Sequence, residues 1–190
     1  MKIWFMRHGE SEANLAGLWT GQLDVPLTEK GRAQAVAAGR IFEGIKFDRI
    51  YSSDLSRARE TAELAIPDCR YETSVLLREM DVGSVAGKPA SVMTPEERLA
   101  IRRDGFAKYG GESMEEFKAR VLAFKELLEG EECENIAVFS HSGWIRRFFS
   151  LAVGMEFPTG KIACGNCASA VYELKNGEWL LCNWNGTVQI

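Results

Sequence analysis

Short apolar runs that alternate with helical patterns constrain the fold of this chain more than any other feature. Such runs lie at residues 2–6, 49–51 and 136–139, and small polar residues and then a helical pattern follow each of them. Runs of this kind are typical of buried strands, and their alternation with helices is typical of layered α/β proteins. The sequence therefore predicts an α/β three-layer sandwich, a mostly parallel central sheet with helices on both faces.

Several helices and one hairpin are marked by local signals. Thr28 can cap a helix that runs toward Glu43 and ends at Gly44. Two capping boxes, each a hydroxyl residue followed three positions later by glutamate, are Thr94 with Glu97 and Ser113 with Glu116. After the second box, one apolar helix face is formed by Met114, Phe117, Val121, Phe124 and Leu128. Asn176-Gly177, between the β-prone runs at residues 171–174 and 179–182, predicts a tight hairpin.

The length of 190 residues favours a single domain over residues 1–190, and no repeat or long linker divides it. Residues 83–111 depart from the regular alternation, because seven glycines and prolines surround one short capped helix. We expect this stretch, called the lid segment below, to be a mobile insertion over one end of the sheet.

Composition argues against several classes of function. The net charge of −4 disfavours general nucleic-acid binding, and no run approaches the ~18 apolar residues of a membrane span. The apolar start at residues 3–6 is too short for a signal peptide, so the five scattered cysteines are expected to be reduced thiols of a cytoplasmic protein. Cys164 and Cys167 have the spacing of a redox pair or of half a zinc site. Without a second pair of ligands, two buried cysteines are the favoured interpretation.

The only two histidines of the chain, His8 and His141, occupy similar settings. Each directly follows a predicted strand and precedes small or polar residues. Sites in open α/β sheets form at the carboxyl ends of strands, so both imidazoles are expected to reach one crevice. The alternative, two unrelated surface or core histidines, would make both placements coincidental.

Two arginines near these strand ends have the chemistry to bind a phosphoryl group. Arg7 precedes His8, and Arg57 lies about one turn into the helix that follows the strand ending near Tyr51. Taken alone, Arg57 would be interpreted as a solvated helix residue. Two guanidinium groups together can neutralise a phosphoryl group and bind it bidentately. Further donors are expected from Ser11, Asn14 and the backbone near Gly21.

With these residues in place, the chain resembles the histidine phosphatase superfamily, in the branch of cofactor-dependent phosphoglycerate mutases and small phosphatases. The resemblance runs in order along nearly the whole chain. Its segments are Arg7-His8-Gly9-Glu10-Ser11 through Asn14, Gly21-Gln22 with Asp24 through Thr28, Ser53 through Ala58, Leu77 through Gly83, Gly111-Glu112-Ser113 and His141-Ser142-Gly143.

The resemblance implies a role for each of these positions. His8 would be the nucleophile, Arg7, Arg57 and His141 would bind the phosphoryl group, and Glu79 would donate the proton. Additional substrate-binding residues would be Ser11, Asn14, Gly21, Gln22, Ser142 and Gly143. The physics agrees, because arginines beside an imidazole keep it neutral and nucleophilic, whereas a proton donor needs burial or a nearby phosphate. No metal or other cofactor is implied.

Two regions around the expected pocket do not specify the substrate. Ser84-Val85-Ala86 stands where phosphatases of the family often carry an aromatic residue and a carboxylate, which weakens any transfer of substrate specificity. In the lid segment, basic and tyrosine side chains are candidates for contact with an anionic substrate, although a solvated helix face is the favoured interpretation. They are Arg98, Arg102, Arg103, Lys108 and Tyr109.

The sequence thus predicts a metal-independent phosphomonoesterase that forms phosphohistidine and acts on a small phosphate ester. Two alternatives stay open. One is a phosphomutase of the phosphoglycerate mutase type, and the other is a non-catalytic phosphate-binding relative. The presence of both histidines, both arginines and the acid counts against the second alternative. Oligomeric state is not specified by any pattern in the sequence.

Overall fold

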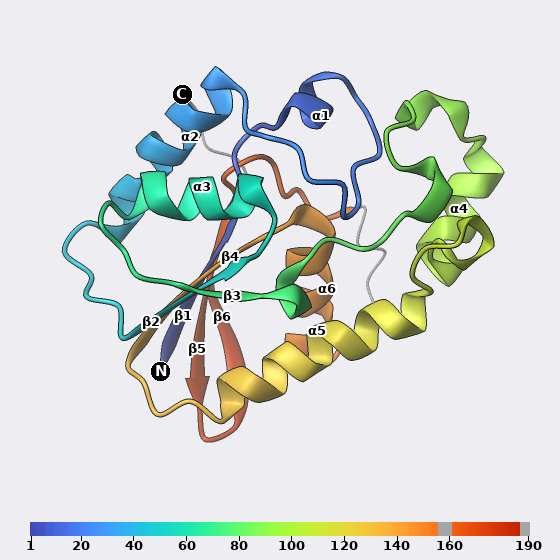
Figure 1. The fold of residues 1–190 in the computed structure, drawn as a ribbon. Coiled ribbons are helices and arrows are strands. Elements are labelled where there is room, and N and C mark those ends of the chain that lie inside the picture. Colours follow the sequence, from blue (N-terminus) through green and yellow to red (C-terminus); the bar gives the residue numbers. More distant parts are fainter. Residues whose placement is uncertain (156–160, 187–190) are drawn as a thin grey trace.

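Six strands form a central sheet in the computed structural model, which describes residues 1–155 and 161–186 (Figure 1). In chain order they are β1 (Lys2–Arg7), β2 (Arg49–Ser53), β3 (Glu72–Ser74), β4 (Asn135–Ser140), β5 (Ser169–Lys175) and β6 (Glu178–Asn185). Their order across the sheet is β3-β2-β4-β1-β5-β6. The pairs among β3, β2, β4 and β1 are parallel, whereas β5 and β6 add an antiparallel edge. The predicted mostly parallel sheet is confirmed.

Helices connect the strands and cover both faces of the sheet (Figure 1). The α-helices are α1 (Glu12–Leu15), α2 (Glu29–Ala38), α3 (Ser56–Ala65), α4 (Pro95–Asp104), α5 (Met114–Glu129) and α6 (Ser142–Ala152). Short 3-10 turns are η1 (Gly39–Phe42), η2 (Val75–Leu77), η3 (Gly83–Val85), η4 (Ala90–Val92) and η5 (Ala107–Tyr109). No helix in the two described ranges is long and apolar enough to cross a membrane.

Local signals placed most helix starts correctly and one helix end incorrectly. Both capping boxes are present, at the start of α4 and of α5, and Thr28 caps α2 by accepting the N–H of Gly31. The α2 helix nevertheless ends at Ala38 and continues only as the 3-10 turn η1, so the predicted helix to Glu43 is too long. Helix ends often tighten in this way because the last carbonyls have no α-helical partner.

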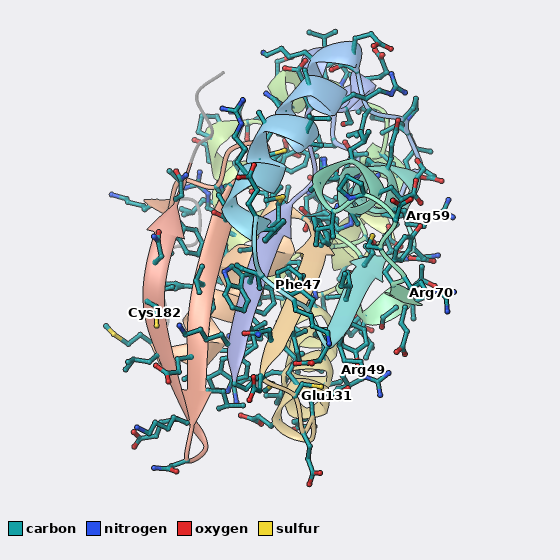
Figure 2. All side chains as sticks on the ribbon, turned by 90° about the vertical axis from the view of Figure 1, so that its left-hand side faces the viewer. Phe47, Arg49, Arg59, Arg70, Glu131 and Cys182 are labelled. Carbon is teal, nitrogen blue, oxygen red and sulfur yellow. The ribbon has the colours of Figure 1, made fainter. Side chains whose placement is uncertain are left out.

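Two apolar cores lie on opposite faces of the sheet. On one face, α5 and α6 pack aromatic and branched side chains against β1 and β4, with Trp144 and Phe148 stacked at 5.4 Å. On the other face, alanines of α2 and α3 allow a close approach, and Trp4 and Phe42 pack edge-on against Phe47. Phe47 is labelled in Figure 2. Because both faces are covered, the polar residues that follow the strands are left at the sheet's carboxyl end.

The hairpin and the lid segment complete the fold. Asn176 and Gly177 both have positive φ (53° and 78°), as a two-residue turn between β5 and β6 requires. The lid segment contains η3, η4, α4 and η5, and it pairs with the loop after α1: Gly87 donates to the carbonyl of Trp19 (2.7 Å), and Trp19 donates to that of Lys88 (2.9 Å). Its predicted mobility stays a prediction.

Candidate active site

The two histidines meet at the carboxyl end of the sheet. His8 follows β1 and His141 follows β4, and these strands are neighbours, with the His8 N–H donating to the carbonyl of Ser140 at 3.0 Å. Both side chains are buried, and their ring centroids lie 5.1 Å apart. The two imidazoles therefore lie side by side at the carboxyl end of the sheet, although only His8 lines the cavity described below.

His8 is held as a neutral imidazole with one defined tautomer. Its Nδ1 lies 2.7 Å from the carbonyl oxygen of Gly9, which only accepts hydrogen bonds, so Nδ1 carries the proton and Nε2 carries the lone pair. Burial, followed by the positive charges of Arg57 and Arg7, holds the pKa of His8 well below its usual value of 6.5. The same causes, burial first, lower the pKa of His141. His8 is thus prepared to act as a nucleophile.

Backbone carbonyls fix the two arginines beside His8. Arg57, in the first turn of α3, donates from Nη1 to Leu23 (2.8 Å) and from Nη2 to Gly21 (2.9 Å). Arg7 donates from Nη1 to the carbonyl of Cys164 at 2.7 Å. Burial lowers the pKa of Arg57 to about 10, so its guanidinium remains charged at neutral pH.

Three buried nitrogens around His8 have no hydrogen-bond partner in the described part of the chain. They are Nε of Arg7, Nε of Arg57 and Nδ1 of His141. Buried polar groups are nearly always paired, so a group of such nitrogens indicates a binding site for an acceptor-rich ligand. An anion with several oxygens suits this site, because two of the three nitrogens belong to cationic side chains that line one cavity.

Glu79 faces the same cavity from a stretch with no regular secondary structure. Its Oε1 accepts the N–H of Met80 (3.0 Å), and its Oε2 accepts the N–H of Gly143 (2.9 Å), near the start of α6. The carboxylate is therefore held from two sides. It is the only acidic side chain among the described residues that line the cavity.

Comparison with known proteins decides the family. The sequence pattern of the histidine phosphatase superfamily (branch 1) matches residues 3–187. The chain belongs to the histidine phosphatase superfamily. Relatives and structural neighbours that are phosphatases of this superfamily show that the chain is an enzyme of the histidine phosphatase class.

Individual relatives agree with this membership. The chain is 34% identical over 151 residues to an adenosylcobalamin/alpha-ribazole phosphatase of Salmonella typhimurium, and the aligned region covers 75% of each chain. It is 29% identical over 194 residues to a probable phosphoglycerate mutase GpmB of Salmonella choleraesuis, covering 97% of this chain and 90% of the relative. The crystal structure of an alpha-ribazole phosphatase from Shigella flexneri superposes with a TM-score of 0.87 at 25% identity, covering 97% and 96% of the two chains.

Most residues predicted for the site of this histidine phosphatase lie around one cavity of about 310 Å³. The lining includes Arg7, His8, Asn14, Gly21, Arg57, Glu79, Ser142 and Gly143. His141 lies beside His8 behind this lining. Ser11 is buried as the cap of α1, where it accepts the N–H of Asn14, and Gln22 donates to the carbonyl of Glu79 at 3.3 Å. Ser11 and Gln22 therefore hold residues of the site instead of lining it.

Gly21, near which the sequence predicted a backbone donor, lines the cavity and also holds Arg57. Its carbonyl oxygen accepts from Arg57, and its φ is +51°. A Cβ at this position would lie 2.7 Å from Cγ2 of Val82 and 2.9 Å from its backbone nitrogen. Only glycine combines this left-handed backbone with such a close approach.

The sequence did not identify the outer walls of the cavity. Most of these walls are apolar, from Trp19, Met80, Val82, Ile101, Phe106, Met114 and Phe117, and α6 adds Arg146 and Arg147. Helical spacing was a usable signal for the two arginines, because they lie four residues after Ser142 and Gly143. Ser53, to which the sequence assigned no role of its own, places its Oγ 2.9 Å from Nε2 of His141.

Of the five lid side chains considered from the sequence, Arg102 alone lines the cavity in the described structure. Arg98 donates to the carbonyl of Met93 (3.0 and 3.1 Å), and Arg103 pairs with Asp104 on the surface. None of residues 84–86 lines the cavity, so the departure from the family pattern lies outside it.

The two closely spaced cysteines face different layers of the fold. Cys164 packs in the core under α5 and α6, whereas Cys167 packs in the core under α2 and α3. Burial raises the pKa of both thiols, that of Cys167 to about 12, so neither is a reactive thiolate. Among residues 1–155 and 161–186, no three His, Cys, Asp or Glu side chains are grouped closely enough to hold a metal ion.

Proposed function

We propose that this histidine phosphatase is a phosphomonoesterase that acts through a covalent phosphohistidine on His8. The observation that carries the proposal is a set of three buried nitrogens, on Arg7, Arg57 and His141, that have no partner among the described residues and lie near a neutral imidazole. A phosphoryl group supplies the oxygen acceptors that these nitrogens lack, and its negative charge is balanced by two guanidinium groups.

In the first step, Nε2 of His8 attacks phosphorus in line with the ester oxygen. The N–P bond forms as the P–O bond breaks, and the departing oxygen takes a proton from Glu79. The carbonyl of Gly9 accepts from Nδ1–H throughout, so it stabilises the positive charge that develops on the ring. Arg7 and Arg57 bind the equatorial oxygens, whose charge is spread in the transition state.

In the second step, water attacks phosphorus of phospho-His8. Glu79, now ionised, takes a proton from that water, the N–P bond breaks, and inorganic phosphate leaves. Each group returns to its starting state, and the net reaction is hydrolysis of a phosphomonoester.

The charge-neutralising role that a metal has in other phosphatases falls here to the two arginines. Mg²⁺ and Ca²⁺ bind chiefly to carboxylate and carbonyl oxygens, and Glu79 is the one carboxylate among the described lining residues. We therefore propose a metal-independent reaction. The substrate class is a small phosphorylated metabolite, supported by the likeness to alpha-ribazole phosphatases.

Trapping the intermediate tests this proposal. Rapid quenching with a ³²P-labelled substrate is expected to yield an acid-labile, base-stable phosphoenzyme in the native protein and none in His8→Ala. The variant is expected to lose essentially all activity while its thermal unfolding stays cooperative. Full activity in His8→Ala, or a phosphoenzyme with the same yield, would overturn the proposal.

The likeness to a probable phosphoglycerate mutase across 97% of the chain supports a second candidate, a phosphomutase. A mutase must protect phospho-His8 from water while the acceptor reorients. We propose hydrolysis because the only cover that the fold supplies from the described residues is the short lid segment. Product analysis with phosphoglycerate and a bisphosphoglycerate primer separates the two, since isomer exchange faster than phosphate release would make the mutase assignment correct.

A further inference from the structure

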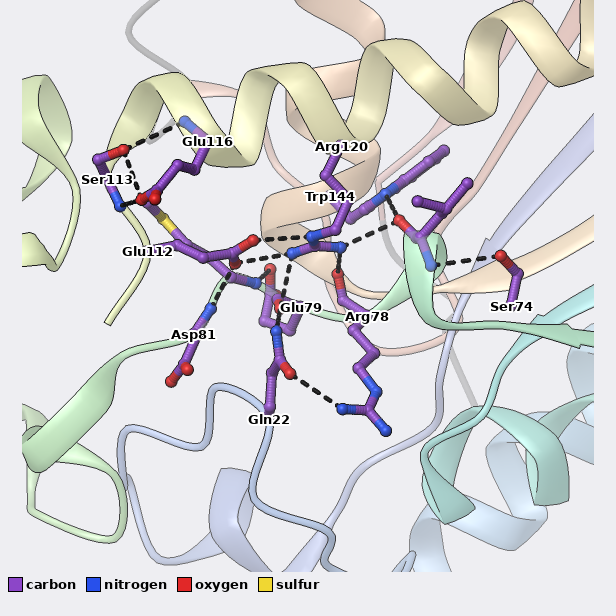
Figure 3. A network of polar contacts seen from close by, with 12 residues as sticks. Gln22, Ser74, Arg78, Glu79, Asp81, Glu112, Ser113, Glu116, Arg120 and Trp144 are labelled. Atoms are coloured by element: carbon purple, nitrogen blue, oxygen red, sulfur yellow. Dashed lines mark hydrogen bonds and ion pairs between the residues drawn. The ribbon is translucent and has the colours of Figure 1, made fainter. Parts of the chain in front are cut away.

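Arg120, in the second turn of α5, binds the backbone that leads to Glu79 (Figure 3). Its Nη1 donates to the carbonyls of Leu76 (3.0 Å) and Arg78 (2.7 Å), and its Nη2 donates to the carbonyl of Glu79 (3.1 Å). One side chain thus holds three carbonyls within four consecutive residues. Lysine has no equivalent geometry, because its donors diverge from a single nitrogen.

Glu112 extends this arrangement to the other side of Glu79. It pairs with Arg120 through two hydrogen bonds, Nε to Oε1 (2.7 Å) and Nη2 to Oε2 (2.8 Å). The same Oε2 accepts the N–H of Asp81 at 2.7 Å (Figure 3). The pair is largely shielded from water, with 14% and 17% of the two side chains exposed. Partial burial makes such a bidentate pair stronger and more rigid than a surface pair.

The backbone around Glu79 depends on these contacts because regular secondary structure does not support it. The 3-10 turn η2 ends at Leu77, and residues 79–82 have neither helical nor strand structure. Without the Arg120–Glu112 pair, the remaining polar contacts that hold Glu79 are those to Gln22, Met80 and Gly143 among the described residues. The backbone that carries Glu79 is therefore held largely by Arg120 of α5, whereas Met80 and Gly143 hold the carboxylate itself.

We infer that Arg120, held by Glu112, is a positioning residue for the proton donor Glu79. This inference rests on the function proposed above. Neither side chain lines the cavity in the described structure, so their effect passes through the backbone at residues 76–81. A proton donor must lie within hydrogen-bond reach of the departing oxygen, and small displacements are costly to the rate. The pair acts on proton delivery and leaves phosphate binding unchanged.

The test compares leaving groups. Nitrophenolate departs from 4-nitrophenyl phosphate without a proton, whereas the alkoxide that leaves glycerol phosphate needs one. A contribution from the general acid therefore appears only with glycerol phosphate. In Arg120→Lys and in Glu112→Gln, kcat on glycerol phosphate is expected to fall at least about 10-fold more than kcat on 4-nitrophenyl phosphate. Competitive inhibition by inorganic phosphate is expected to stay within about 2-fold of the native value, because Arg7 and Arg57 are not disturbed.

Glu79→Gln separates failure of this inference from failure of the proposed function. If Glu79→Gln loses equal activity on both substrates, the proton-donor assignment itself is wrong. If Glu79→Gln shows the leaving-group dependence and the Arg120 and Glu112 variants do not, only the positioning role is overturned. In the double variant Glu79→Gln/Arg120→Lys, we expect no further loss on glycerol phosphate beyond that of Glu79→Gln.

Arg103→Lys is the matched control, because Arg103 pairs with Asp104 on the surface and does not line the cavity. It is expected to behave as the native enzyme on both substrates. Thermal unfolding shows whether each variant is folded. If Arg120→Lys does not fold, Glu112→Gln carries the comparison, since it keeps the size of the side chain and an oxygen that can accept from Asp81. Equal losses on both substrates in the folded variant would overturn the inference.

Discussion

Replacement of Gly143 by alanine is expected to impair proton transfer without destabilising the fold. A Cβ at Gly143 would collide with Oε1 of Glu79 and lie 3.1 Å from its Cδ and 3.2 Å from Oε2. Ordinary contacts begin at 3.4 Å, so the carboxylate has to move by about 1 Å. A displacement of this size in a catalytic group typically costs about 10²-fold in rate. That loss corresponds to about 2.7 kcal/mol in the activation free energy.

The fold itself tolerates this change for two reasons. The colliding atoms belong to the end of a flexible side chain, and Gly143 lies near the start of α6, outside the left-handed region of φ. Alanine also favours the helix by up to about 1 kcal/mol relative to glycine. Thermal unfolding of Gly143→Ala is therefore expected at or slightly above the temperature of the native protein.

Steady-state kinetics on two substrates measure the effect. We expect kcat on glycerol phosphate to fall about 10²-fold and kcat on 4-nitrophenyl phosphate to fall much less, because only the alkoxide needs the proton. Gly130→Ala is the matched control, since a Cβ there meets nothing closer than 3.5 Å, at the end of α5. Native activity of Gly143→Ala on glycerol phosphate would refute the reasoning, as would a loss of equal size on both substrates.

Three further expectations follow from the site. Because the pKa of His8 lies well below 6.5, the pH profile of kcat/KM is expected to show no protonation of the nucleophile near pH 6.5. A fall in kcat/KM centred near pH 6.5 that ionisation of the substrate's phosphate does not explain would contradict this. Folding lowers the pKa values of His8 and His141, so below about pH 6.5 the unfolded chain takes up protons that the folded protein does not. The free energy of unfolding is therefore expected to decrease as the pH falls from 7.5 to 5.5. Urea unfolding at several pH values checks this, and His141→Gln is expected to weaken the dependence. Activity is expected to survive dialysis against EDTA. If activity were lost and a divalent metal restored it, Arg7 and Arg57 would not be sufficient to neutralise the phosphoryl group.

The local elements and the place of the chemistry could be predicted from the sequence because their signals lie between near neighbours. A capping box such as that of Ser113 and Glu116 joins residues three apart, and the turn at Asn176-Gly177 depends on the φ values of those two residues. His8 and His141 could be placed together because each follows a strand, and parallel strands end at one edge of the sheet. Arg57 became a candidate through its place near a strand end together with Arg7, whereas Glu79 was added by the family pattern, because a loop position alone would not have indicated it.

Tertiary structure alone decided how these side chains are held, because the contacts concerned join residues far apart in the chain. Arg7 contacts a carbonyl 157 positions away, and Arg120 contacts one 44 positions away. The direction of each side chain also depends on packing, which turns Cys164 and Cys167 toward opposite faces of the sheet. Residue types and their spacing thus determined the strands, the caps and the residues proposed to react. The packing of α5, α6 and the lid segment determined the walls of the cavity and the position of Glu79, the proposed proton donor, since a sequence carries no direct record of which distant surfaces meet.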